Sequence, residues 1–125
     1  MSIQRFNVGK RLSEAVVHGN TIYLAGEVPD DTAKDITGQT EEVLAKIDKL
    51  LKQAGSDKSK ILSAQIFLPD MKDFAGMNVA WEKWVVPGQT PARATIEAKL
   101  ANPACKVEIM CIAALEGLAQ AVSRR

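Results

Sequence analysis

Two charged side chains near the end of the sequence lie in segments that otherwise read as strands. Arg93 follows a proline in residues 91–96, and Glu108 is the acidic residue of residues 106–109. An arginine guanidinium suits bidentate capture of a carboxylate. A carboxylate among apolar neighbours is costly unless it is paired, hydrogen-bonded or used in proton transfer. The two residues therefore form a candidate anion site with a group that could orient or deprotonate water.

Both residues also have structural alternatives. Arg93 could be a surface strand residue in a weak cross-strand ion pair with a glutamate, which composition alone favours. Glu108 could be the structural partner of Arg93 or of Lys99, and the spacing does not decide between the two roles.

Other polar or flexible residues could add to a pocket. Asn78 lies on the apolar face of an expected helix, where packing against a loop or a cap competes with substrate contact. Gly26 ends an apolar strand and could let backbone approach a ligand, although a plain turn is the stronger alternative. Thr95 and Ser13 have no obvious activating base, which argues against covalent catalysis. His18 is the only histidine, so no metal site can be built around it.

The first half of the sequence contains signals for a hairpin and a helix. Residues 15–18 and 21–25 are β-like runs around a Gly-Asn turn signal, and a further short strand can be placed at residues 3–7. A helix is expected from about Thr37 to Ala54, because apolar residues recur there at helical spacing. Thr37 is its expected N-cap and the following glycine its stop.

The second half repeats the pattern loosely. Residues 62–68 alternate as a strand, with Leu62, Ala64, Ile66 and Leu68 expected on one face. Residues 70–73 are expected to cap a second helix, which carries an apolar face up to Val85 and is broken by Pro-Gly at residues 87–88. Two closing strands then hold Arg93 and Glu108.

This order predicts an α+β fold with two helices on one face of a mixed sheet. The other face is left bare, and we expect it to carry Arg93 and Glu108 among apolar neighbours. Such a face requires a partner subunit, so a homo-oligomer is expected.

Length and composition set broader limits. The 125 residues indicate one domain, residues 1–125, and 16 basic against 15 acidic residues argue against a nucleic-acid partner. Cys105 and Cys111 have no metal-binding spacing and indicate a reducing compartment. The sequence holds no apolar run of membrane-spanning length and no export signal, so a cytoplasmic location is expected.

The order and spacing of four motifs resemble the RidA (YjgF/L-PSP, reactive intermediate deaminase) family over nearly the whole chain. The motifs are residues 21–29, 73–78, 91–96 and 106–109, and the last two form the family's signature region. Residues 11–15 and 81–85 are most similar to the YoaB-type bacterial branch.

This resemblance implies a chorismate-mutase-like fold that assembles as a homotrimer, with a central barrel and clefts between subunits. The implied activity is hydrolysis of imines and enamines, such as 2-aminoacrylate, to 2-keto acids and ammonia, without a cofactor. Arg93 would grip the substrate carboxylate and Glu108 would position or deprotonate water. Gly26 and Asn78 would help to shape the pocket.

The sequence departs from the family pattern at three pocket positions. Leu12 replaces an aromatic residue, Ala25 a serine and Thr95 a cysteine, so the residues around the anion site leave the substrate open. An alternative function is a non-enzymatic binding protein for small carboxylates such as 2-keto acids. RNA cleavage or translation inhibition is a weaker third reading, because the net charge is near neutral and no basic-aromatic stripe is present.

Overall fold

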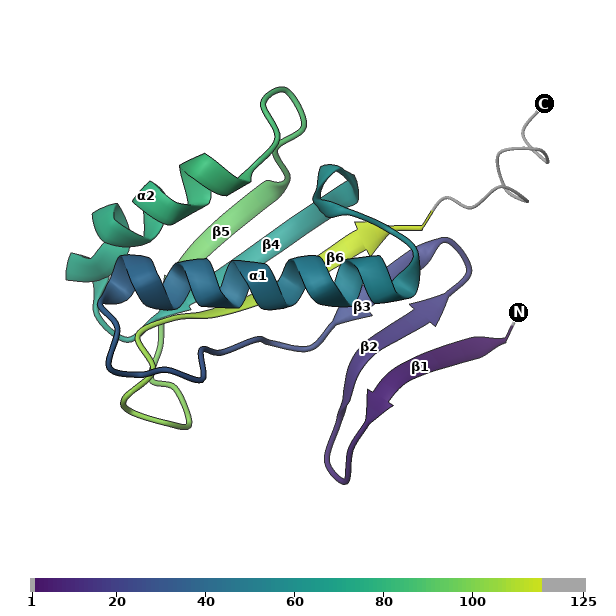
Figure 1. The fold of residues 1–125 in the computed structure, drawn as a ribbon, viewed down its shortest axis with the longest axis horizontal. Coiled ribbons are helices and arrows are strands. Elements are labelled where there is room, and N and C mark those ends of the chain that lie inside the picture. Colours follow the sequence, from purple (N-terminus) through teal and green to yellow (C-terminus); the bar gives the residue numbers. More distant parts are fainter. Residues whose placement is uncertain (1, 116–125) are drawn as a thin grey trace.

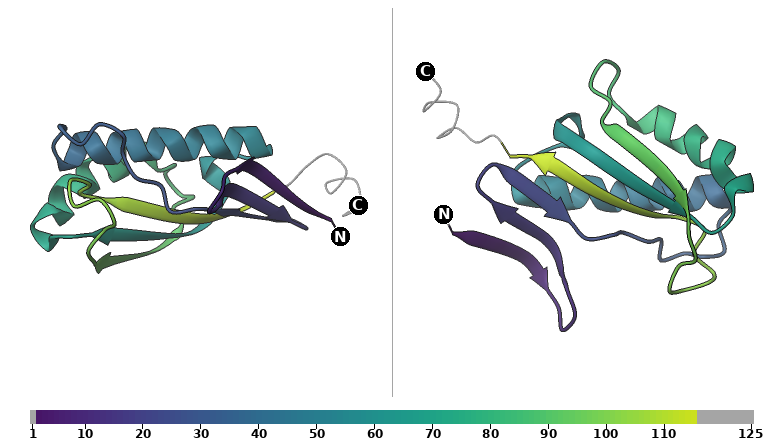
Figure 2. Two further views of the ribbon diagram at one scale, coloured as in Figure 1. Left: turned by 90° about the horizontal axis from the view of Figure 1, so that it is seen from below. Right: turned by 180° about the vertical axis from the view of Figure 1, so that it is seen from behind.

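The computed structural model describes residues 2–115, which form a mixed sheet of six strands with two helices on one of its faces (Figures 1 and 2). The expected α+β fold is therefore confirmed. The strands are ordered β1-β2-β3-β6-β4-β5 across the sheet. Their bounds are β1 (Ile3–Val8), β2 (Ser13–His18), β3 (Thr21–Leu24), β4 (Ile61–Leu68), β5 (Ala92–Glu97) and β6 (Glu108–Ala114). The helices are α1 (Ile36–Ala54) and α2 (Phe74–Trp84), with 3₁₀ turns η1 (Lys58–Lys60) and η2 (Met71–Asp73).

Neighbouring strands are antiparallel except for β4 and β5, which are parallel. Helix α2 makes the crossover between these two strands, as parallel pairing requires. The β1–β2 hairpin extends from the other edge of the sheet (Figure 1). The expected strand at residues 3–7 and the hairpin turn are both confirmed, and Gly19 has a positive φ of 62°.

Helix α1 begins one residue earlier than expected. Its N-cap is Asp35, whose side chain accepts a hydrogen bond from the Gly38 amide at 2.8 Å. The prediction of Thr37 as the cap is wrong, because its hydroxyl instead donates to the Gly76 carbonyl of α2 at 2.8 Å. The expected stop is confirmed, since Gly55 adopts a left-handed conformation with φ of 91°.

A register irregularity changes the start of β4. The alternation predicted that Leu62 shares the buried face of Ala64, Ile66 and Leu68. Instead Leu62 is 54% exposed and Ile61 is buried, because the pairing with β6 shifts between Ile61 and Ser63. A bulge of this kind exchanges the faces of the residues before it.

The second helix is shorter than its apolar pattern indicated. Of the expected cap at residues 70–73, Asp70 caps the 3₁₀ turn η2, and its side chain accepts from the Lys72 amide at 2.9 Å. Asp73 is the N-cap of α2 but makes no side-chain capping hydrogen bond. Helix α2 ends at Trp84, so Val85 is its C-cap and not part of its apolar face. The helix thus ends before the Pro-Gly pair that was expected to break it.

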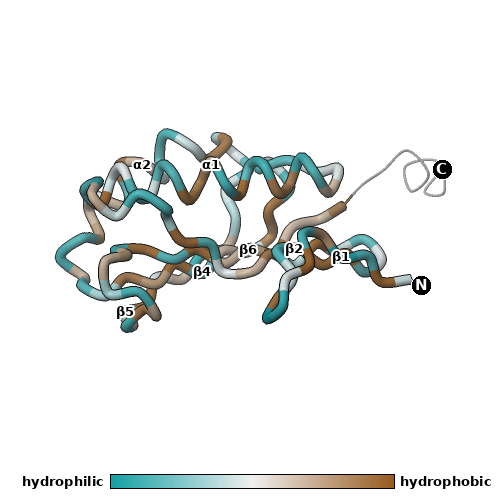
Figure 3. Tube along the Cα trace, turned by 60° about the horizontal axis from the view of Figure 1, so that its bottom comes forward, coloured by the Kyte–Doolittle hydropathy of each residue, from teal (hydrophilic) through white to brown (hydrophobic). Residues whose placement is uncertain are grey.

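The core lies between the helices and the sheet. Hydrophobic residues recur along β4 and β6 (Figure 3), and those facing the helices are almost fully buried. The core is built mainly from Ile22, Val43, Leu44, Ile47, Leu51, Ile66, Leu68, Met77, Val107, Ile109 and Ala113.

The opposite face of the sheet is covered by no element of residues 2–115 (Figure 2). Tyr23 is 47% exposed there, and Phe67, Met110 and Ile112 are only partly buried. The expectation of a bare, largely apolar face is therefore confirmed. Neither helix in this part of the chain is long and apolar enough to cross a membrane.

The capping role of Asp35 is open to a direct test. Asp35→Ala removes the acceptor for the Gly38 amide and is expected to lower the free energy of unfolding by about 1 kcal/mol. Asp35→Asn, which caps helices equally well, is the matched control and should retain wild-type stability. Chemical denaturation of the three proteins measures the difference. A loss caused by Asn as large as that caused by Ala would contradict the assignment.

Candidate functional site

Arg93 lies on the edge strand β5, on the side of the sheet that faces the helices. In the parallel register Arg93 pairs with Ala64, which is buried against the helices. Paired residues of neighbouring strands point to the same face. The expectation that Arg93 lies on the bare face is therefore wrong, because the face of a strand residue is set by its register.

Side chains of α2 hold the Arg93 guanidinium. Its Nη1 donates to Asn78 Oδ1 at 2.7 Å, and its Cζ lies 5.3 Å from the ring centroid of Trp81 and 5.8 Å from that of Phe74. Phe74, Asn78 and Trp81 recur at helical spacing, so one stripe of α2 supplies all three contacts. The side-chain oxygen of Asn78 is thus hydrogen-bonded to a strand residue.

In this environment the Arg93 guanidinium keeps its positive charge and has N–H donors left for a further partner. Burial lowers the pKa of Arg93, and the nearby Glu82 carboxylate opposes that shift. The guanidinium stays charged because an arginine pKa begins far above neutrality. Asn78 accepts a hydrogen bond from only one of the five N–H groups of the guanidinium. The Arg93 side chain is exposed. An open pocket of about 270 Å³ bordered by Ser63 and Gln65 reaches this edge of the sheet from the bare face, where the register places those two residues.

Thr95 lies on the same side of β5 as Arg93, because it pairs with the buried Ile66. Its Oγ1 is buried and has no hydrogen-bond partner in the described part of the chain. Buried hydroxyls normally have a partner, so Thr95 is an exception among the described residues.

Glu108 lies on the bare face, at the start of β6, where it pairs with Phe67. Gly26 makes room for it: a Cβ at Gly26 would overlap the Glu108 carboxylate and lie 2.9 Å from its carboxyl carbon. A side chain at position 26 would therefore displace Glu108. Gly26 is thus more than a turn residue.

Arg93 and Glu108 of one chain consequently face opposite sides of the sheet. Among the ion pairs formed within residues 2–115, none includes Arg93, Glu108 or Lys99. The structural alternatives, in which these residues pair with one another, are therefore wrong for the described chain.

The remaining predicted pocket residues lie elsewhere. Leu12 is 54% exposed in the loop between β1 and β2, near the sheet edge opposite β5. Ala25 follows β3, and its amide donates to the Glu14 carbonyl at 2.9 Å. The described chain thus brings Arg93 and Asn78 together and Gly26 and Glu108 together, and it leaves Leu12 apart.

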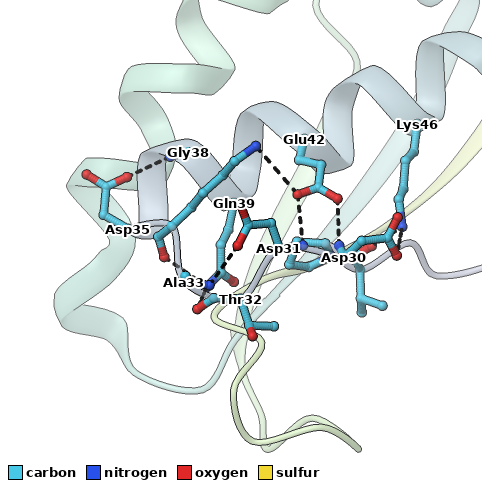
Figure 4. A network of polar contacts seen from close by, with 12 residues as sticks. Asp30, Asp31, Thr32, Ala33, Asp35, Gly38, Gln39, Glu42 and Lys46 are labelled. Atoms are coloured by element: carbon cyan, nitrogen blue, oxygen red, sulfur yellow. Dashed lines mark hydrogen bonds and ion pairs between the residues drawn. The ribbon is translucent and has the colours of Figure 1, made fainter.

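A polar network fixes the chain between Gly26 and α1 (Figure 4). The Glu42 carboxylate accepts from the amides of Asp30 and Asp31, at 2.6 and 3.1 Å. These hydrogen bonds, with that of the Asp30 amide the largest cause, lower the pKa of Glu42. Lys46 Nζ donates to the Val28 carbonyl at 2.7 Å and to Asp30 at 2.9 Å.

Sequence reasoning missed Gln39, which links this network to β6. Gln39 is fully buried, and its Oε1 accepts from the Lys106 amide at 2.8 Å, two residues before Glu108. Its Nε2 donates to the carbonyls of Thr32 and Lys34. A glutamine among the apolar positions of the helix was the signal that could have revealed it.

Sequence reasoning also missed Glu27, which is only 7% exposed. Desolvation by burial, together with the neighbouring Glu14 carboxyl, raises the pKa of Glu27 to about 8. The sequence signal that could have revealed Glu27 was its position directly after Gly26, which ends an apolar strand.

Of the cysteines and the histidine, Cys105 contacts the polar network, since its Sγ donates to the Pro29 carbonyl at 3.9 Å. Cys105 and Cys111 are free and buried, and burial raises the pKa of Cys111 to about 12. Its thiol therefore stays protonated at neutral pH. His18 is exposed at the end of β2, as expected for a hairpin residue.

Comparison with known proteins agrees with this arrangement. Residues 2–115 match the family described as "Endoribonuclease L-PSP". The chain is 55% identical to a RutC family protein of Haemophilus influenzae over 90% of its own length and 98% of the relative's. It is 49% identical to the RutC family protein YoaB of Escherichia coli, over 92% of this chain and all of YoaB.

A solved structure and a more distant relative extend the comparison. A YjgF-family protein from Neisseria meningitidis superposes with a TM-score of 0.91 at 45% identity, covering 94% of this chain and 98% of that one. Reactive Intermediate Deaminase A of Arabidopsis thaliana is 32% identical, over 82% of this chain and 58% of the relative. Fold and sequence together define a small α+β protein of the L-PSP type. The chain belongs to the RidA/YjgF family, in its YoaB-type branch.

The contact between Asn78 and Arg93 leads to a testable expectation. Asn78→Leu removes the acceptor, so the guanidinium is less well fixed and the affinity for 2-ketobutyrate should fall roughly five-fold. Asn78→Gln retains an uncharged amide oxygen as an acceptor and is the matched control for folding and for the contact. Calorimetric titration measures both. Wild-type affinity in the Leu variant would show that Asn78 does not position Arg93.

Proposed function

We propose that this protein hydrolyses small reactive 2-imino and enamine acids, of the 2-aminoacrylate type, to 2-keto acids and ammonia. The observation that carries the proposal is the exposed Arg93 guanidinium, held by Asn78 and by the aromatic rings of α2. Membership of a family with a relative named Reactive Intermediate Deaminase A supports it.

The proposed reaction needs little more than correct placement of substrate and water. Arg93 binds the substrate carboxylate and so fixes the neighbouring imine carbon. Glu108 accepts a proton from a water molecule, whose oxygen then bonds to that carbon. Glu108 returns the proton to the nitrogen, which gives a carbinolamine; the proton of its hydroxyl then moves to the nitrogen as the C–N bond breaks and the C=O bond forms, so that ammonia and the keto acid leave. An enamine acid enters this sequence after tautomerising to the imine. No electrons are exchanged with a third compound.

We further propose that each site forms between two subunits of a homotrimer. Within one chain Arg93 and Glu108 face opposite sides of the sheet, so one substrate cannot readily reach both. A second copy packed on the bare face would bury Tyr23 and Phe67, and it would place its Arg93 edge near the first chain's Glu108. Leu12 and Thr95 would then line the same cleft from different chains.

Removal of the guanidinium tests the proposed activity. Imines generated in situ by an amino-acid oxidase should yield ammonia and keto acid faster with the wild-type protein. Arg93→Ala should abolish this acceleration, and Arg93→Lys, which keeps charge without the planar fork, should recover only part of it. Unchanged acceleration in Arg93→Ala would refute the role of Arg93.

The same assay separates the proposed enzyme from a binding protein. If 2-ketobutyrate or benzoate binds in an Arg93-dependent manner but hydrolysis is not accelerated, a non-enzymatic carboxylate-binding protein is the correct description. RNA cleavage that persists in Arg93→Ala would come from another site or from a contaminant.

Mixed oligomers test whether the site is shared between subunits. Arg93→Ala and Glu108→Ala should each be inactive alone. Trimers reassembled from equal amounts of both should recover about one quarter of wild-type activity, because a quarter of the interfaces combine an intact Arg93 with an intact Glu108. No recovery in verified mixed trimers, or a monomer by light scattering, would contradict a shared site.

A further inference from the structure

A pair of carboxyl groups lies beneath α1, on the side of the sheet away from Glu108. The side chain of Glu27 is almost fully buried, and its carboxyl is hydrogen-bonded to that of Glu14 from β2. Both line a pocket of about 240 Å³ at the C-terminal half of α1. The polar side chains around them are Asn7, Lys46, Lys49 and Gln53.

A hydrogen bond between two carboxyl groups requires a proton on one of them, because an ionised carboxylate only accepts. Two ionised carboxylates in direct contact would repel each other, and burial makes this repulsion more costly. The Glu14–Glu27 contact is therefore the contact of a carboxylic acid with a carboxylate.

The charged groups that face the pair do not neutralise it. Lys46 of α1 lowers the pKa of Glu27, but its ammonium is already bonded to the Val28 carbonyl and to Asp30. Asp30 and Glu14 act in the opposite direction and raise that pKa. Lys49 of α1 lines the same pocket. Burial is the largest influence, and the balance favours a protonated Glu27 at neutral pH.

The backbone of Glu27 connects this pair to the candidate site. The Glu27 amide donates to the Ile109 carbonyl at 2.8 Å, and the Ile109 amide donates to the Glu27 carbonyl at 3.0 Å. Gly26 and Glu108 are the residues next to this bridge, and they contact each other on the opposite face. A displacement of Glu27 would therefore move both of them.

We propose that Glu14 and Glu27 share one proton, and that the proton-bridged pair is a positioning element that holds Gly26 against Glu108 and releases this contact when the proton is lost. Its consequence for catalysis rests on the proposed function of Glu108. The pairing itself and its effect on the Glu27–Ile109 bridge do not.

The direction of the pH effect follows from proton linkage. The pKa of Glu27 rises from 4.5 to about 8 on folding, so between these values the folded chain binds more protons than the unfolded chain. Stability therefore falls as the pH rises through this window and levels off above it. In Glu27→Gln an amide donates in place of the acid, so the hydrogen bond to Glu14 persists without the titration.

Thermal unfolding between pH 5 and pH 9 tests the shared proton. Compared with Glu27→Gln, the wild-type protein should lose roughly 5 °C more in Tm between the ends of this range. Glu41→Gln, at an exposed position of α1, is the control and should follow the wild-type profile. If Glu27→Gln does not fold, Glu14→Gln is the second variant: it leaves Glu27 buried, so the pH dependence of Tm should persist but be smaller than in the wild-type protein, and an unchanged pH dependence would overturn the shared proton.

Amide hydrogen exchange tests the positioning role, which a merely structural pair would not reveal. After correction for the intrinsic pH dependence of exchange, protection of the Glu27 and Ile109 amides should fall above pH 8 in the wild-type protein and stay constant in Glu27→Gln. Identical pH profiles in the two proteins would overturn the proposal. A Tm difference without any response of these amides would also overturn it. Neither measurement depends on imine turnover, so the proposal can fail or hold independently of the proposed activity.

Discussion

The packing of both helices on a single face of the sheet is the constraint on which the other features depend. It buries one set of alternating strand residues in the core and leaves the other set without a cover. Because successive strand residues point to opposite faces, each functional side chain is assigned to the helix layer or to the bare face by its register alone. Arg93 falls on the first and Glu108 on the second.

This division explains why the two charged side chains of one chain lie in separate surroundings on opposite faces. The α2 side supplies a fixed cation with an aromatic surround, which suits a carboxylate. The bare face supplies a carboxylate set against the backbone at Gly26, which suits a water molecule. The buried polar groups of the 27–35 loop and of Gln39 lie on the helix side of the sheet and fix the backbone on either side of Gly26 and Glu108. The precision of the Glu108 position therefore comes from the helix side of the sheet.

The sequence was a good guide to elements and a poorer guide to faces. Apolar periodicity located both helices and all six strands, because an element that buries one face carries apolar residues at a regular spacing along its own sequence. It misplaced Leu62, since a bulge is set by the partner strand and leaves no local mark. It chose Thr37 over Asp35 as the cap because two capping residues stood close together, and a contact with Gly76 decided between them.

The candidate site shows the same limit. Residue type was enough to single out Arg93, Glu108, Gly26 and Asn78, but not the opposite orientation of the first two. That orientation depends on pairing between strands far apart in sequence. Glu27 and Gln39 were missed because their burial depends on contacts between the 27–35 loop and α1, which local spacing does not reveal.

The fit between Gly26 and Glu108 also bears on how such a chain can diverge. The space that a side chain would occupy at one position is filled by the carboxylate of the other, although the two lie more than eighty residues apart in the sequence. A lineage that shortened residue 108 would free position 26 to accept a larger residue, whereas the reverse order would pass through a crowded intermediate. Substitutions at these two positions are therefore ordered in time, and the loss of Glu108 would open a route to new pocket shapes that the present chain cannot reach in one step.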